Sequence, residues 1–90
     1  MGRRKYPPLS SSEVIGILEA LGFALKRQTG SHAHYERQAG TQKPRAVVTV
    51  DTSIPEYWER IIKSMIRQST FSREEFYGAT KKTAKKINLR

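Results

Sequence analysis

The hydrophobic residues of this chain change their spacing twice along the sequence. They recur at helical spacing over residues 14–21, at nearly every second position within residues 23–50, and at helical spacing again over residues 58–66. This order predicts a helix, a group of β-strands and a second helix. Because 90 residues are enough for one domain and too few for two ordinary ones, we expect these elements to share one core.

Three serine–glutamate pairs have the spacing of a capping box, in which a serine begins the helix and a glutamate three residues later bonds back to it. They predict three helix starts. The first helix should end at Gly22, the second should occupy residues 54–68, and the third should be short and end near Gly78. The pairs are Ser10 with Glu13, Ser53 with Glu56, and Ser72 with Glu75.

Three strands are predicted between the first two helices, over residues 23–28, 32–37 and 45–50. Residues 29–31 have the length of a hairpin connection, and residues 38–44 form a longer loop with glycine and proline, so both suit antiparallel neighbours. The sheet has one face to bury and each main helix has one apolar side. The predicted fold class is therefore α+β, in the order α-β-β-β-α: a three-stranded antiparallel sheet packed on two helices, plus a short C-terminal helix.

Alternation along the strands assigns their residues to two faces of the sheet. Trp58 falls on the apolar side of the second helix and is expected in the core, whereas the pattern leaves Tyr57 undecided. Polar chemistry should then gather on the face left open to solvent. The core-facing set is Phe23, Leu25, Ala33 and Tyr35, and the solvent-facing set is Lys26, Gln28, His32, His34 and Glu36.

Positive charge is concentrated at the two ends of the chain. The chain has 17 Lys and Arg against 8 Asp and Glu, a formal charge of +9, yet residues 6–80 carry nearly equal numbers of basic and acidic side chains. An excess of positive charge favours an anionic partner, with nucleic acid first. We expect a basic extension over residues 1–8, a domain over residues 9–78, and a basic tail over residues 79–90 that is frayed or disordered.

Composition excludes several classes of function. The chain has no cysteine, which excludes a disulfide framework, a thiolate zinc site and a catalytic cysteine. It has no glycine-rich phosphate loop and no GxSxG nucleophile motif, and we expect no cofactor. No run of about 18 apolar residues could cross a bilayer, and the first ten residues lack the apolar stretch of a secretory signal. We therefore expect a soluble, cytoplasmic protein that does not bind membranes.

The candidate chemistry centres on a histidine directly after a tight turn. Gly30 and Ser31 form the turn, and His32 begins the next strand. An imidazole that titrates near neutral pH can take the proton of an RNA 2′-hydroxyl, which then attacks the adjacent phosphate. Cations would stabilise the charge on that phosphate. The candidates are Lys26, Arg27, Lys43 and Arg45, of which Lys26 is preferred because it shares the face of His32.

Other interpretations of the same residues stay open. An exposed histidine on a hairpin is often a surface residue without chemistry. His32, His34 and Glu36 alternate along one strand and could face a shared metal ion, although no second cluster of ligands occurs elsewhere in the sequence. The cations between residues 26 and 45 could equally belong to a solvated hairpin, where charge suppresses edge-to-edge aggregation.

Several motifs occur in a fixed order along the chain. Arg-Gln-Thr-Gly-Ser-His at residues 27–32 is the most specific, and Pro-Leu-Ser, Leu-Gly-Phe and Val-Val-Thr-Val stand at residues 8–10, 21–23 and 47–50. A helical segment at residues 61–68 and a closing segment at residues 72–76 follow. Over about residues 8–78 the chain resembles the HicA family of bacterial toxins, which are small ribonucleases of toxin–antitoxin pairs.

The resemblance implies a fold like that of the double-stranded RNA-binding domain. It also implies metal-independent cleavage of messenger RNA and inhibition by a HicB-like antitoxin. We expect the free protein to be a monomer. By position, the family's essential histidine falls on His32 and the glycine before it on Gly30. Many members have a second histidine where this chain has Ala33. Here His34 follows one position later with the same facing as His32, so His34 is a possible helper or substitute base.

Two rival functions remain open at this point. A noncatalytic module of the same fold would hold structured RNA through cations and 2′-hydroxyl contacts. A basic adaptor would bind any polyanion through its charged tails.

Overall fold

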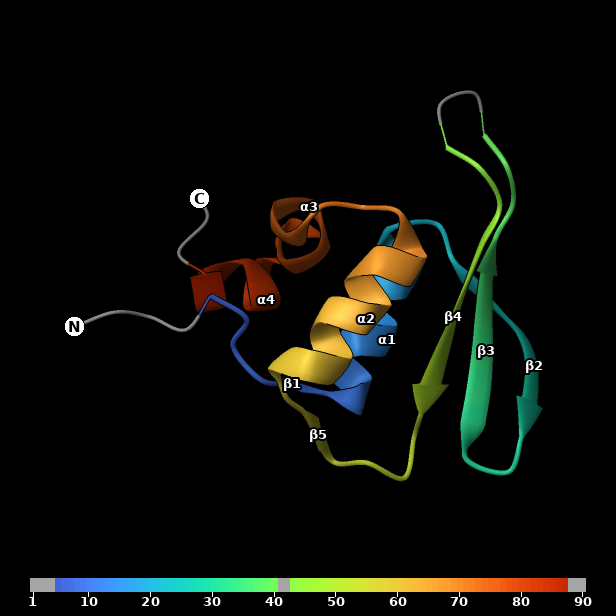
Figure 1. Ribbon diagram of the computed structural model, residues 1–90, viewed down its shortest axis with the longest axis horizontal. Coiled ribbons are helices and arrows are strands. Elements are labelled where there is room, and N and C mark those ends of the chain that lie inside the picture. The colour runs from blue at the N-terminus through green and yellow to red at the C-terminus, as the bar shows by residue number, and fades with distance from the viewer. Residues whose placement is uncertain (1–4, 41–42, 88–90) are drawn as a thin grey trace.

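The computed structural model describes residues 5–40 and 43–87 of the chain. Its centre is a three-stranded antiparallel sheet in the order β2-β3-β4, where β2 is Ala24–Thr29, β3 is His32–Arg37 and β4 is Ala46–Asp51. The helices α1 (Ser11–Ala20) and α2 (Glu59–Ser69) cover the same face of this sheet (Figure 1). The structure therefore confirms the predicted α+β class, with a sheet and helices arranged as in a double-stranded RNA-binding domain.

The first predicted helix start is confirmed. The Ser10 hydroxyl accepts the Glu13 N–H at 3.1 Å, and the Glu13 carboxylate accepts the Ser10 N–H at 2.9 Å, so both halves of the capping box are present. Leu9 and Val14 lie on either side of this cap and are fully buried, as in a hydrophobic staple. After the helix, Gly22 has a φ of +94°, a conformation that favours glycine and turns the chain into β2.

The second predicted helix start is wrong. The Ser53 hydroxyl donates to the Asp51 carboxylate at 2.6 Å and so does not cap a helix. Residues 56 and 57 instead form β5 (Glu56–Tyr57), which pairs with β1 (Leu9–Ser10). The helix begins after Trp58, five residues later than the pattern predicted.

The late start of α2 also changes which of its residues are buried. Ile62, Met65 and Ile66 enter the core as predicted. Trp58 was predicted to be buried but is 52% exposed, because it precedes the first turn of α2 and does not share the helix's apolar side. Tyr57, which the pattern left undecided, is 2% exposed, and its hydroxyl donates to the Asp51 carbonyl.

Two predictions for β2 are wrong, and a β-bulge in this strand accounts for the first of them, the facing of Gln28. The pairing of β2 with β3 shifts between Leu25 and Arg27, so that Arg27 lies opposite His34 and Gln28 lies opposite the buried Ala33. Gln28 is therefore on the helix-covered side rather than the predicted solvent side. Leu25 was predicted to be in the core and lies opposite the buried Tyr35, but it is 50% exposed. The two long helices pack mainly against β4, and every residue of β2 is exposed.

The prediction that the chain is frayed beyond Gly78 is wrong for residues 81–87. The expected short helix is α3 (Arg73–Gly78), and it is followed by α4 (Lys81–Ala84) and a 3₁₀ turn at Lys85–Ile87. Thr83 is 1% exposed, and its hydroxyl donates to the Tyr77 carbonyl at 2.6 Å. The predicted tail residues 88–90 and extension residues 1–4 lie outside the described part of the chain.

One core joins β1, β3, β4, β5, α1, α2 and α3. Its buried apolar side chains come from the strands, from both long helices and from α3. They are Leu9, Val14, Ile17, Leu18, Phe23, Ala33, Tyr35, Ala46, Val48, Val50, Tyr57, Ile62, Met65, Ile66, Phe76 and Tyr77.

Glu13 connects the first helix to the C-terminal one. The ammonium groups of Lys86 and Lys82 lie 3.4 and 3.8 Å from its carboxylate oxygens. Burial alone would raise the pKa of Glu13, but the hydrogen bond from the Ser10 N–H and the two lysines together lower it. A carboxyl group whose pKa is lowered by folding stabilises the protein above its unfolded pKa, about 4.3, and this stabilisation is lost as the pH falls through the folded value.

We therefore expect Glu13→Gln to reduce the free energy of unfolding by about 1 kcal/mol at pH 7, since glutamine keeps the bond to the Ser10 N–H but loses the charge. Urea unfolding at several pH values measures this difference, which should shrink as the pH falls below about 4. Glu19→Gln on the same helix, where the carboxylate is exposed, is the control and should cost less. A difference between wild type and Glu13→Gln that stays constant down to pH 2 would contradict the assignment.

Candidate functional site on the open face of the sheet

The side of the sheet away from α1 and α2, here called the open face, brings most of the predicted site residues together. Residues that are paired across the three strands form rows on this face. His32 lies between Thr29 and Asp51 in one row, and His34 lies between Arg27 and Thr49 in the next. The helices do not cover these rows (Figure 1). The open face carries Arg27, Thr29, His32, His34, Glu36, Val47, Thr49 and Asp51.

His32 stands at the end of the open face beside the hairpin turn. Gly30 has a φ of +59°, which permits the two-residue turn of Gly30 and Ser31. The His32 side chain is 59% exposed, and its Nε2 lies 3.7 Å from Oδ2 of Asp51 on the neighbouring strand. The imidazole is therefore both accessible to a ligand and next to a carboxylate.

Asp51 is held in place by its own loop. Its Oδ1 accepts the Ser53 N–H at 3.0 Å and the Ser53 hydroxyl at 2.6 Å. These hydrogen bonds, followed by one from the Ser31 hydroxyl and the charge of His32, lower the pKa of Asp51. The carboxylate is thus ionised at neutral pH and presents negative charge to the His32 ring.

His34 lies one row further along the same face. Its Nδ1 is 3.0 Å from the Thr49 hydroxyl. The ring also lines a hollow of about 200 Å³ together with three cations. The residues that line the hollow are Lys26, Arg27, His34, Arg45 and Val47. Three cationic side chains around one small hollow form a site suited to an anionic group.

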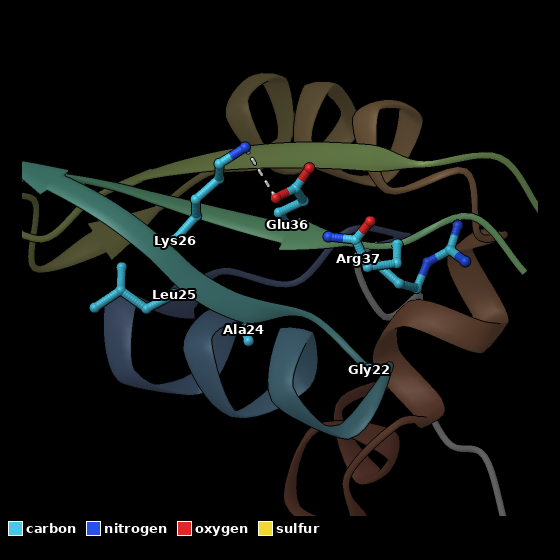
Figure 2. A pocket seen from close by; sticks show the side chains of 7 residues that line it. Gly22, Ala24, Leu25, Lys26, Glu36 and Arg37 are labelled. Atoms are coloured by element: carbon cyan, nitrogen blue, oxygen red, sulfur yellow. Dashed lines mark ion pairs between the residues drawn. The ribbon is translucent and has the colours of Figure 1, made fainter.

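Glu36 balances part of this positive charge. Figure 2 shows Lys26 directed toward Glu36, and their charged atoms are 3.2 Å apart. Arg45 contacts the other carboxylate oxygen. Hydrogen bonds from Lys26 and then Arg45 lower the pKa of Glu36, which keeps it ionised. In the described part of the chain, no ion pair joins Arg27 to a carboxylate, so its charge is available to a ligand.

Lys43 lies apart from the other predicted cations. Its ammonium donates to the Thr70 carbonyl at 2.9 Å and lies 4.5 Å from the centre of the Phe71 ring. It therefore contacts the connection between α2 and α3. Arg37 packs beside it, with its guanidinium over the Phe71 ring as well.

The sequence alone missed two features of this face. The bulge brings Arg27, rather than Gln28, beside His34, and no residue pattern in β2 marked it. Asp51 lies opposite His32 because β4 runs antiparallel to β3. Pairing the residues of these two strands outward from the loop at residues 38–44 could have predicted this neighbour of His32. Among residues 5–40 and 43–87, no group of three or more histidine, aspartate and glutamate side chains is placed to hold a metal ion.

The fold and the open face together define a small α+β domain of the double-stranded RNA-binding-domain type that carries two imidazoles among cations. A family model described as the HicA toxin of bacterial toxin–antitoxin systems matches residues 11–70. The chain therefore belongs to the HicA toxin family. Searches of curated proteins and of solved structures find no significant match. Within the described ranges, no helix is both long and apolar enough to cross a membrane.

Proposed function

We propose that this chain is a toxin that cleaves messenger RNA as a metal-independent endoribonuclease, with His32 as the general base. The observation that carries the proposal is the exposed His32 ring, 3.7 Å from an ionised carboxylate. It lies on the same face of the sheet as a hollow lined by three cations. Family membership supports the same activity.

The proposed reaction uses the RNA 2′-hydroxyl as nucleophile. His32 takes the 2′-hydroxyl proton, the 2′-oxygen bonds to the adjacent phosphorus, and the bond from phosphorus to the 5′-oxygen breaks. The products are a 2′,3′-cyclic phosphate and a 5′-hydroxyl, whose oxygen receives a proton from an imidazolium. Arg27, Lys26 and Arg45 would stabilise the additional negative charge on the phosphate oxygens. DNA lacks the nucleophile and would not be cleaved.

His34 has two possible roles in this scheme. Alternate residues of a strand are about 6.6 Å apart along the strand and share one face, so both rings can flank one phosphate. His34 then either donates the proton to the leaving 5′-oxygen or replaces His32 as the base. Its place in the cation-lined hollow favours contact with the phosphate.

We propose Lys43 as a phosphate contact outside the hollow. It would bind RNA that extends past this end of the sheet, after its ammonium leaves the Thr70 carbonyl. The partners proposed with this function are a HicB-like antitoxin and messenger RNA. The free toxin is proposed to be a monomer in the cytoplasm.

The test compares three substrates with the purified chain in the presence of EDTA: an RNA oligonucleotide, the same oligonucleotide with one 2′-deoxy position at the cleaved bond, and its DNA equivalent. We expect cleavage of the RNA only, with a 2′,3′-cyclic phosphate end. Cleavage that EDTA abolishes, or that tolerates the 2′-deoxy position, would exclude the mechanism. RNA binding without cleavage would favour the noncatalytic module, with an affinity that falls steeply with salt.

A further inference from the structure

We propose that Asp51 is a positioning residue that orients the His32 ring. In this arrangement Nε2 carries the proton and faces Asp51, and Nδ1 is the nitrogen that accepts the proton from the substrate. The catalytic part of this inference rests on the proposed function. The arrangement of the two side chains does not, and it can be measured without RNA.

The strand register brings the two residues together. His32 and Asp51 are directly opposite in the antiparallel pairing of β3 with β4, which places their side chains next to each other on one face. The His32 Nε2 lies 3.7 Å from the Asp51 Oδ2, and the other ring nitrogen has no hydrogen-bond partner in the described part of the chain. A carboxylate accepts hydrogen bonds and cannot donate one when ionised, so it favours the ring form with the proton on Nε2.

The Asp51 carboxylate is held by hydrogen bonds, and those from Ser53 go to one of its two oxygens. Both hydrogen bonds from Ser53 go to Oδ1, and Oδ2 is the oxygen that lies 3.7 Å from His32 Nε2. The Ser31 hydroxyl also donates a hydrogen bond to this carboxylate. The backbone around it is also tied to the hairpin turn, since the Thr52 N–H and hydroxyl both donate to the Ser31 carbonyl, at 2.7 and 3.0 Å. The turn that presents His32 and the loop that presents Asp51 are thus held as one unit.

The other groups near His32 do not compete for this role. Its partner on β2 is Thr29, which has no charge. The next row holds His34 and Arg27, and the Nδ1 of His34 is near the Thr49 hydroxyl. Within the described residues, Asp51 is the only carboxylate that lies within ion-pair distance of His32.

Asp51→Asn is the most informative variant, because the two hydrogen bonds from Ser53 determine the orientation of the asparagine amide. Both Ser53 donors need an acceptor, so the amide oxygen takes the place of Oδ1 and the NH₂ group takes the place of Oδ2. The NH₂ group then donates to Nε2 and drives the proton onto Nδ1. This is the wrong ring form for a base that acts through Nδ1.

The experiment records ¹⁵N NMR spectra of the imidazoles at alkaline pH, where the rings are neutral, in wild type, Asp51→Asn and the control Glu56→Gln. We expect His32 to carry its proton on Nε2 in wild type and in the control, and on Nδ1 in Asp51→Asn. In parallel, kcat for RNA cleavage should fall about 10²- to 10⁴-fold in Asp51→Asn with KM unchanged. Glu56→Gln, which removes an exposed carboxylate on the adjacent β5, should change neither quantity.

The two proposals fail in different ways. A wild-type His32 protonated on Nδ1, or the same ring form in wild type and Asp51→Asn, would overturn the role of Asp51. The wild-type spectrum decides this even if the variant does not fold. An altered ring form in a chain that does not cleave RNA would uphold the geometry while the proposed function fails. A wild-type kcat in Asp51→Asn would also overturn the role.

Discussion

Replacement of His32 by alanine is expected to reduce RNA cleavage by about 10²- to 10⁴-fold, the contribution typical of a general base. The side chain is 59% exposed, and its one ion-pair contact within the described residues is to Asp51, so its removal should leave the fold intact. Induced expression of wild type should arrest growth while messenger RNA decays. His32→Ala should relieve both effects, and its thermal unfolding should match that of wild type.

His34→Ala is the matched control for this experiment, because it removes the same ring from the same face one row away. If His34 donates the proton to the leaving group or holds the phosphate, its loss should weaken cleavage less than the loss of His32. Relief of growth arrest by His34→Ala alone would move the base two residues along β3. A folded His32→Ala variant that stays fully toxic would exclude the assignment.

Phe76→Ala is expected to reduce the free energy of unfolding by about 3–5 kcal/mol, a large part of the stability of a small domain. Phe76 lies on α3, is fully buried, and meets the Tyr77 ring edge-on with centroids 6.3 Å apart. The family model ends at residue 70, before α3. The prediction therefore tests whether the segment beyond that match belongs to the core.

Urea unfolding of the full chain measures this effect, and Leu25→Ala provides the control. Leu25 is also a large apolar residue but is 50% exposed on the edge strand, so its loss should cost less than about 1 kcal/mol. A cost below about 1 kcal/mol for Phe76→Ala, or a separate early transition that involves α3 alone, would mean that the core does not depend on this helix.

Local sequence patterns predicted a helix start correctly where the capping serine bonds within its own helix. The capping boxes at Ser10 and Ser72 were right because each serine accepts a hydrogen bond from its own helix. The same spacing at Ser53 failed because its hydroxyl donates to Asp51 instead. Helix α4 and the 3₁₀ turn after it were missed because their stability comes from the burial of Thr83 and from the contact of Lys86 with the Pro8 carbonyl and Glu13. These contacts join distant parts of the chain.

Only part of the site could be predicted, because some of its contacts join residues of different strands. Alternation along β3 is local, and it correctly placed His32 and His34 on one face. The partner of His32 comes from another strand, so Asp51 required the register, which the sequence pattern did not fix. Whether His32 is the base stays a prediction that the growth and cleavage experiments must decide.

The bulge in β2 has a consequence for comparing this chain with its relatives. Residues before and after the shift between Leu25 and Arg27 follow different alternations, so the face that a side chain occupies depends on the number of residues between Gly22 and the hairpin turn. A relative with one residue fewer in that interval could conserve every residue type and still turn its arginine toward the helices. Counting the positions in this short interval is therefore as informative about RNA contact as the identity of the residues that fill it.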